Sequence, residues 1–165
     1  MKTTFELLSD LDIKYFCALF NINLKNVLLK DEYINVIPEI GCYVINLDDT
    51  TSGRGGTHWT CLIITSSHCI IYFDPFGLPI PYPIKLFIKK YKHQSKIIYS
   101  TDDIQYIDSI FCGWFCIYFM YFITVLHSKN NNYGYLLNKH NTIYNLQNKY
   151  LNDKILRNLI KQISF

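Results

Sequence analysis

The segment from Ile110 to Leu126 constrains the fold more strongly than any other, because none of its 17 residues is charged. A run of this length is at the short limit for a helix that crosses a bilayer. It contains two cysteines, however, and it lacks the flanking basic clusters that are typical of membrane spans. We therefore interpret residues 112–127 as a helix buried in the core of a globular domain, and we expect no membrane contact.

The rest of the chain is long enough to enclose such a helix. Half of the 165 residues are hydrophobic, and 18% are charged, which is below the usual quarter for globular domains. No repeat, linker or low-complexity tract divides the sequence. We therefore predict one domain over residues 1–165, and we expect it to act as a monomer.

Four short runs rich in branched and aromatic residues predict a small β-sheet. They cover residues 41–47, 60–65, 68–73 and 97–99. Two serines separate the second run from the third, so these two runs predict an antiparallel hairpin. The sequence DPFG then ends the hairpin, because proline cannot continue the ladder of a central strand.

Helical patterns precede and follow these strands. Ser9 is expected to cap a helix over residues 10–20, and residues 24–29 predict a further short turn of helix. Residues 83–92 predict another helix, and a final amphipathic helix begins near Asn152. The inner face of the first helix is predicted to carry Leu11, Tyr15, Phe16 and Leu19. Helices before and after a small central mixed sheet make the predicted fold class α+β.

The ends of the hairpin bring a histidine and an aspartate together. If three residues form the loop, the residue numbers of each opposed pair add up to 132, as those of His58 and Asp74 do. Opposed side chains lie about 5 Å apart at Cβ. A carboxylate there can hold an imidazole in one tautomer and stabilise its charged form. The alternative is a surface histidine beside a loop aspartate, and a two-residue loop would shift the register by one.

Cys112 stands where a polar stretch, residues 101–109, meets the apolar helix. The positive end of the helix dipole favours a thiolate at such a position. Gly113 follows and leaves room for a substrate backbone. Gln105 precedes Cys112 by seven residues, and its amide could donate to an oxyanion together with the Cys112 N–H. The alternative is a buried structural cysteine at a helix start.

The other cysteines favour the core over a metal site. The first ten residues contain no long apolar stretch, so we expect no signal peptide and reduced thiols. No two cysteines have the spacing of a zinc finger, and we expect no metal and no required cofactor. Cys116 is interpreted as a core residue one turn behind Cys112. The metal alternative would draw on His58, Cys61, His68, Cys69, Cys112 and Cys116.

Four short motifs occur in a fixed order: GTHW at residues 56–59, YFDPFG at 72–77, Gln105, and a Cys-Gly pair at 112–113 with Cys116 beyond it. Over about half of the chain, this arrangement resembles adenain, the adenovirus-type maturation protease, and its relatives in virophages and Polinton-type elements. The resemblance implies an α+β fold with papain-like active-site geometry and the chain order His–Asp/Glu–Gln–Cys. The acidic position is Asp here, where adenain has Glu.

The resemblance also implies roles for individual residues. His58 would be the general base, Asp74 the third member of the triad, Gln105 the oxyanion donor and Cys112 the nucleophile. Trp59 would pack beside the imidazole and shield it from water. Three residues would contact the substrate, namely Gly56, Trp59 and Gly113.

On this resemblance the protein is expected to be a cysteine endopeptidase that cleaves viral capsid or virion precursor proteins during particle maturation. Cleavage is expected next to Gly or other small residues, in the host cytoplasm at assembly sites and in the virion interior. Adenain carries a disulfide-linked peptide on a cysteine ahead of its oxyanion Gln. No cysteine lies between Cys69 and Cys112 here, so only a non-covalent peptide activator is expected.

The mild positive charge of the chain makes stimulation by DNA one of the possible activities to consider. The formal net charge is +3. A basic face could contact DNA without sequence preference, although a solvated helix surface is the simpler explanation of such clusters. The two basic clusters are Lys89, Lys90, Lys92 and Lys96, and Lys154, Arg157 and Lys161.

Two other functions remain open. Deconjugases of ubiquitin-like modifiers share this clan and its His-Trp pair, but they usually carry Asp directly before the nucleophile and Gln six residues ahead. Here Phe111 precedes Cys112, and the Gln105 spacing is seven. A non-catalytic virion protein that keeps the protease fold is the second alternative, and the four intact catalytic residue types weigh against it.

Overall fold

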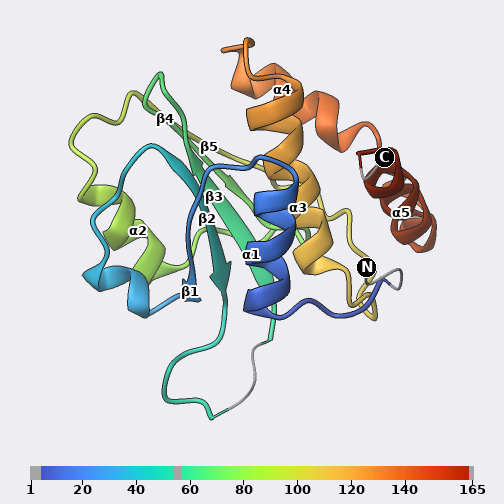
Figure 1. The fold of residues 1–165 in the computed structure, drawn as a ribbon, viewed down its shortest axis with the longest axis horizontal. Helices are drawn as coiled ribbons and strands as arrows, with labels where there is room; N and C mark the ends of the chain where they lie inside the picture. The colour runs from blue at the N-terminus through green and yellow to red at the C-terminus, as the bar shows by residue number, and fades with distance from the viewer. Residues whose placement is uncertain (1–4, 54–56, 164–165) are drawn as a thin grey trace.

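The computed structural model describes residues 5–53 and 57–163, which form a mixed five-stranded sheet with helices against both faces (Figure 1). The strands are β1 (Leu24–Leu29), β2 (Gly41–Asn46), β3 (Trp59–Ile64), β4 (Cys69–Phe73) and β5 (Lys96–Tyr99). They lie across the sheet in chain order. The outer pairs, β1 with β2 and β4 with β5, are parallel, whereas β3 is antiparallel to both of its neighbours.

Five α-helices occur among the described residues, and together with the mixed sheet they confirm the α+β prediction. The helices are α1 (Asp10–Leu19), α2 (Tyr82–Lys89), α3 (Cys112–Tyr121), α4 (Tyr133–Asn141) and α5 (Asn152–Ile163). Short irregular helices complete the chain, namely η1 (Glu32–Asn35), η2 (Phe122–Leu126) and η3 (Lys149–Leu151). No helix in the described part of the chain is long and apolar enough to cross a membrane.

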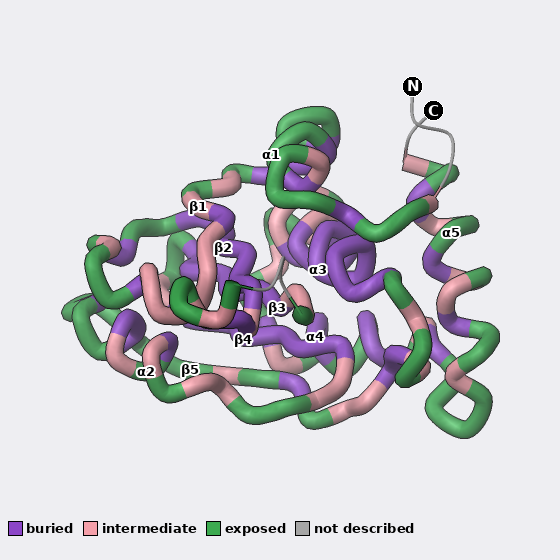
Figure 2. Tube along the Cα trace, turned by 90° about the horizontal axis from the view of Figure 1, so that it is seen from below, coloured by how far each residue is buried: buried purple, intermediate pink, exposed green. Residues whose placement is uncertain are grey.

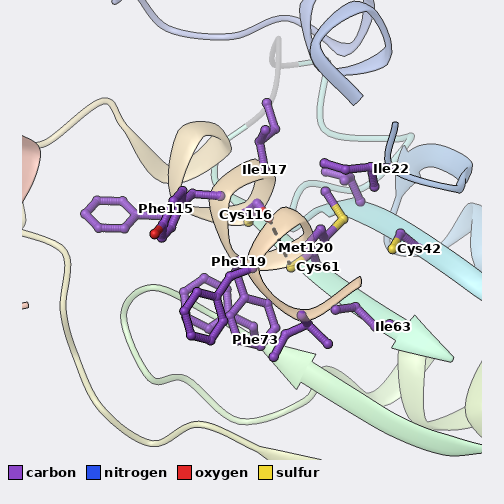
Figure 3. Packing of buried hydrophobic residues seen from close by; sticks show 14 of the residues in the cluster. Ile22, Cys42, Cys61, Ile63, Phe73, Phe115, Cys116, Ile117, Phe119 and Met120 are labelled. Atoms are coloured by element: carbon purple, nitrogen blue, oxygen red, sulfur yellow. Dashed lines mark hydrogen bonds between the residues drawn. The ribbon is translucent and has the colours of Figure 1, made fainter. Parts of the chain in front are cut away.

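The predicted buried helix is α3, and its first nine residues are all buried. Figure 2 shows it surrounded by other segments, and Figure 3 shows its side chains packed on β3 and β4. The ring of Phe119 stacks on that of Phe73 at a centroid distance of 4.3 Å. Burying each large apolar side chain stabilises the fold by about 1.5–3 kcal/mol, so α3 anchors this side of the sheet.

Alternate residues of the central strands face two separate cores. Cys42, Cys61 and Phe73 face the core that contains α1, α3, α4 and α5. Tyr43 and Leu62 face the smaller core beneath α2. A strand that is buried on both faces has a nearly continuous run of apolar residues, so such strands are easy to recognise in the sequence. Four apolar residues in α2 and just beyond it are buried in this smaller core, namely Ile84, Phe87, Ile88 and Tyr91.

Two predictions near the N-terminus were wrong. Residues 24–29 form strand β1, not a turn of helix, because they pair in parallel with β2. The inner face of α1 is also different, since Leu11 is 70% exposed whereas Phe16 is buried. Tyr15 and Leu19 are exposed as well, and the buried residues of α1 are Ile13, Phe16 and Cys17. Both sets have helical spacing, so only the tertiary contacts decide between them.

Candidate active site

The sheet and α3 bring the predicted catalytic residues to one end of the fold. His58 directly precedes β3 and Asp74 directly follows β4. Because these strands are antiparallel, both residues lie at the same end of the strand pair. Cys112 is the first residue of α3, which packs against β3. A strand start, a strand end and a helix start therefore converge on one place.

His58 and Asp74 are in direct contact. The Nε2 atom of His58 lies 2.9 Å from Oδ1 of Asp74. Asp74 is fully buried, and the same oxygen accepts a hydrogen bond from the backbone N–H of Phe76 at 2.8 Å. The ring of Phe76 stacks on the imidazole at a centroid distance of 4.6 Å. The carboxylate and the aromatic ring together fix the orientation of the imidazole.

The predicted register of the hairpin was wrong by two residues, although its conclusion about these side chains holds. Cys61 pairs with Phe73, so the position opposite His58 in the same register is Phe76 rather than Asp74. A shift of one residue would turn a side chain to the other face, whereas a shift of two keeps the face. His58 and Asp74 are therefore diagonal neighbours, and such neighbours remain within reach of a long side chain.

The shift of register comes from the turn. The backbone N–H of Thr65 still bonds the carbonyl of Cys69 at 3.0 Å, so the loop comprises residues 66–68. His68 closes it with a positive φ of 62°, a conformation that histidine adopts more readily than most side chains. No Gly or Asn stands at this position to indicate a left-handed residue.

The thiol of Cys112 is a second hydrogen-bond partner of the His58 imidazole. Burial lowers the pKa of His58, but hydrogen bonds with Asp74 and with the Cys112 thiol, together with their charges, raise this pKa to about 9. Because Asp74 engages Nε2, Nδ1 is the ring nitrogen left for the thiol. Near neutral pH the imidazolium is therefore the favoured form, and an imidazolium stabilises a neighbouring thiolate.

The start of α3 offers further stabilisation for a negative charge. Phe111 occupies the N-cap position and provides no side-chain hydrogen bond to the helix. The first N–H groups of a helix have no partner within the helix, and the dipole places partial positive charge there. The Cys112 sulfur and any oxyanion formed beside it would both lie in this field.

Gln105 is buried in the loop that leads to Cys112. Its side-chain N–H donates to the carbonyl of Ser109 at 2.7 Å, and its backbone N–H donates to the carbonyl of Pro75 at 3.0 Å. The second bond ties this loop to the turn that follows Asp74. Among the described residues, Oε1 of Gln105 has no hydrogen-bond partner. The second N–H of the amide is the group that could donate to an oxyanion.

The three predicted substrate contacts have different outcomes. Trp59 donates its indole N–H to the carbonyl of Leu8 at 3.0 Å, and its ring lines the same groove as His58 and Cys112. A Cβ atom on Gly113 would lie 3.2 Å from Leu8 Cδ1 and 3.3 Å from Trp59 Cδ1. Leu8 and Trp59 therefore fill the space that a side chain at this position would need, and contact between Gly113 and a substrate backbone stays a prediction. Gly56 lies outside the described residues.

A groove of about 590 Å³ begins at His58 and Cys112. Its walls come from the segment before α1, the end of β1 with the adjoining Glu32, and the stretch around His58. This groove was not predicted, because residues 24–29 were interpreted as helix and they form one of its walls as β1. Its apolar lining comprises Leu7, Leu8, Val27, Leu28, Leu29 and Trp59, and its polar lining comprises Ser9, Asp10, Glu32, Asn46, Thr57, His58 and Cys112.

A second cavity of about 350 Å³ shares no lining residue with this groove. It lies beside Phe76, which stacks on the imidazole, and beside Gln105. The stacked rings of Tyr106 and Tyr150 form part of its wall, with a centroid distance of 3.8 Å. The candidate catalytic residues thus border two separate open spaces.

The remaining cysteines are buried and free. Burial raises the pKa of Cys116 well above its ordinary value, and its Sγ lies 3.4 Å from the carbonyl of Trp59. Figure 3 shows this residue beside Cys61 within the core. Within residues 5–53 and 57–163, no group of three or more His, Cys, Asp or Glu side chains could hold a metal ion.

Comparison with known proteins bears on the fold. No protein-family model matches the sequence, and no curated protein matches it. A solved structure of the selenomethionine-labelled ASFV pS273R protease matches with a TM-score of 0.53 and 16% identity, over 79% of this chain and 61% of that one. A second structure of this protease gives a TM-score of 0.47 and 16% identity, over 70% and 56%. The chain thus spans about six tenths of the length of that protease, and it has the fold of a viral protease.

Proposed function

We propose that this protein is a cysteine endopeptidase. The observation that carries the proposal is the 2.9 Å contact between His58 and Asp74 next to Cys112 at the start of α3. A nucleophile, a base and a group that orients the base are the parts that covalent acyl transfer needs. Their arrangement on a viral protease fold makes peptide hydrolysis the function that this site supports best.

In the proposed mechanism, the Cys112 thiolate attacks the scissile carbonyl and His58 holds the proton as imidazolium. The oxyanion is stabilised by the Cys112 N–H and the Gln105 amide. When it collapses, the C–N bond breaks and the amine leaves with the proton from His58. Water, deprotonated by His58, then hydrolyses the thioester and releases the acid and the free thiol.

The walls of the groove support a preference for Gly or another small residue at the cleaved bond. Leu8 and Trp59 fill the space beside Gly113, next to the nucleophile. A bulky substrate side chain there would have to displace a packed indole whose N–H is hydrogen-bonded. Open space beside His58 and beside Gln105 supports an endopeptidase, which must accommodate chain on both sides of the bond.

The substrates we propose are viral capsid or virion precursor proteins, cleaved in the host cytoplasm at assembly sites and inside the particle. This part of the proposal rests on the resemblance of the sequence motifs to adenain. DNA or a non-covalent peptide could act as a stimulator, and the basic residues around the end of α2 support a test with DNA. Of these, Lys90 already donates to the carbonyl of Ile34.

The test is cleavage of purified virion precursor proteins, mapped by intact mass, with and without DNA. We expect wild type to cut next to Gly or another small residue and Cys112→Ala to be inert. Cys69→Ala removes a buried thiol elsewhere and is the matched control, which should retain activity. Cleavage of a ubiquitin-like precursor alone would favour a deconjugase, and inactivity on both classes of substrate would contradict the proposal.

A further inference from the structure

The loop that carries Gln105 is held on one side by the first residue of α5. Asn152 is fully buried, and its side-chain N–H donates to the carbonyl of Ile104 at 2.8 Å. The same amide group exchanges two hydrogen bonds with the backbone of Asn145, at 2.8 and 3.0 Å, so its orientation is fixed. The residue directly before Gln105 therefore cannot move without breaking a buried hydrogen bond.

The second residue of α5 holds the other side of this loop. The carboxylate of Asp153 accepts a hydrogen bond from the Ser109 hydroxyl at 2.8 Å, and this hydroxyl accepts one from the N–H of Phe111 at 3.2 Å. The carbonyl of Ser109 is also the acceptor for the Gln105 side chain, at 2.7 Å. Asp153 is thus connected through Ser109 to the Gln105 amide and to the backbone N–H of Phe111, the residue before Cys112.

Two further contacts restrict the same loop. The guanidinium of Arg157, one turn along α5, lies 4.7 Å from the ring centroid of Phe111. On the opposite side, the carbonyl of Pro75 accepts from the backbone N–H groups of Ile104 and Gln105, at 2.9 and 3.0 Å. The loop is therefore fixed between α5 and the turn after Asp74. Neither Asp153 nor Ser109 lines either open space at the site, so neither is placed to touch a substrate.

We propose that Asp153, acting through Ser109, is a positioning residue for the two oxyanion donors, the Gln105 amide and the Cys112 N–H. The inference rests on the proposed function. An oxyanion donor must lie about 2.7–3.1 Å from the place where the negative charge develops. A displacement of about 1 Å can cost up to 10²-fold in rate, so a hydrogen bond that fixes the loop contributes to the chemical step rather than to substrate binding.

The test compares Asp153→Ala and Ser109→Ala with wild type on a peptide that contains the cleavage site found for the wild-type protein. We expect kcat to fall on the order of 10-fold in both variants, with KM changed by less than about twofold. Asp153→Asn should retain most of the activity, because an amide oxygen can still accept from Ser109. Asn158→Ala, at an exposed position on the same helix, is the matched control and should behave as wild type.

Two readouts separate positioning from a general loss of structure. The rate at which iodoacetamide alkylates Cys112 should be unchanged, because this reaction forms no oxyanion. In a Gln105→Ala background, Asp153→Ala should cost less than it does in wild type, because the part of its effect that acts through Gln105 is already lost. If Asp153→Ala does not fold, as judged by thermal unfolding, the test rests on the kcat of Ser109→Ala and of Asp153→Asn.

The inference is overturned if Ser109→Ala and Asp153→Ala cleave at the wild-type rate. It is also overturned if alkylation falls in parallel with kcat, or if the loss persists in full without Gln105. These outcomes leave the proposed function intact, because wild type still cleaves and Cys112→Ala does not. If wild type itself cleaves no substrate, the proposed function fails and this inference fails with it.

Discussion

At the level of single residues, the site depends on the hydrogen bonds that the buried Asp74 carboxylate makes. Oδ1 of Asp74 bonds both the imidazole of His58 and the backbone of Phe76, whereas Oδ2 has no hydrogen-bond partner among the described residues. Because the carboxylate is buried at low dielectric, the hydrogen bonds that it makes are stronger than they would be in water. It also accounts for much of the rise in the pKa of His58, against the effect of burial.

We predict that Asp74→Asn lowers peptide cleavage by roughly 10²-fold or more, because the imidazole loses its charge partner and its fixed tautomer. The pKa of His58 should fall, so the high-pH limb of the activity profile, expected near pH 9 in wild type, should move to lower pH. The measurement is kcat/KM against pH for both proteins. Glu39→Gln, at an exposed ion pair, is the control, and an unshifted profile in Asp74→Asn would contradict the role of Asp74.

At the scale of elements, α4 buries a group that makes the fold sensitive to acid. His140 is fully buried among the rings of Phe73, Phe119 and Phe122. Burial lowers the pKa of this histidine to about 4, while the hydrogen bond with Asn141 opposes the shift only in part. The folded state therefore holds a neutral imidazole that the unfolded state protonates below about pH 6.5.

The sign of the pH dependence follows from this shift. Between about pH 6.5 and pH 4, the unfolded chain binds a proton at His140 that the folded chain does not, so the free energy of unfolding falls as the pH falls. We predict a loss of about 2 kcal/mol between pH 7 and pH 5 from this residue alone. His140→Phe should remove most of that loss, as measured by urea unfolding at both pH values. An equal loss in the variant would show that other groups cause it.

The elements also show what sequence can and cannot predict. Strands β2, β3 and β4 are continuous apolar runs, and the sequence locates them within one or two residues. The helix predicted over residues 112–127 begins at the predicted residue but is divided into α3 and the η2 segment. Strand β1 was missed because Leu24–Leu29 fits a helical turn equally well until β2 pairs with it. Helix α4 was not predicted, because Gly134 and several polar residues surround its buried Leu136 and Leu137 and leave no clear apolar periodicity.

At the scale of the whole molecule, the site is assembled from segments that are far apart in the chain. His58 and Asp74 could be placed together from hairpin geometry, because only a short turn separates their strands. Leu8, which bonds Trp59, and Asp153, which bonds Ser109, belong to the two ends of the chain. Such contacts cannot be predicted from a local sequence pattern, because they depend on how α1 and α5 pack against α3.

The groove is another property of the assembled fold, and it gives a prediction about binding. Leu28 lies in the groove wall, where an apolar side chain can contact a peptide. We predict that Leu28→Glu raises KM on the order of 10-fold and leaves kcat nearly unchanged, because it removes binding energy that does not depend on the transition state. Ile37→Glu, at a position that is 80% exposed and outside the groove, is the control. A fall in kcat without a change in KM would place Leu28 outside the substrate site.

If Cys112 is a nucleophile activated by His58, its rate of alkylation reports that activation without any substrate. The measurement is the rate of iodoacetamide modification at pH 6, resolved for each of the six cysteines by peptide mass, in wild type and His58→Ala. We predict rapid modification of Cys112 in wild type, because the imidazolium stabilises its thiolate, and a strong loss of that rate in the variant. The other five thiols should stay unmodified, because burial raises the pKa of Cys17, Cys42, Cys61, Cys69 and Cys116. Slow modification of Cys112 that His58→Ala leaves unchanged would contradict the account.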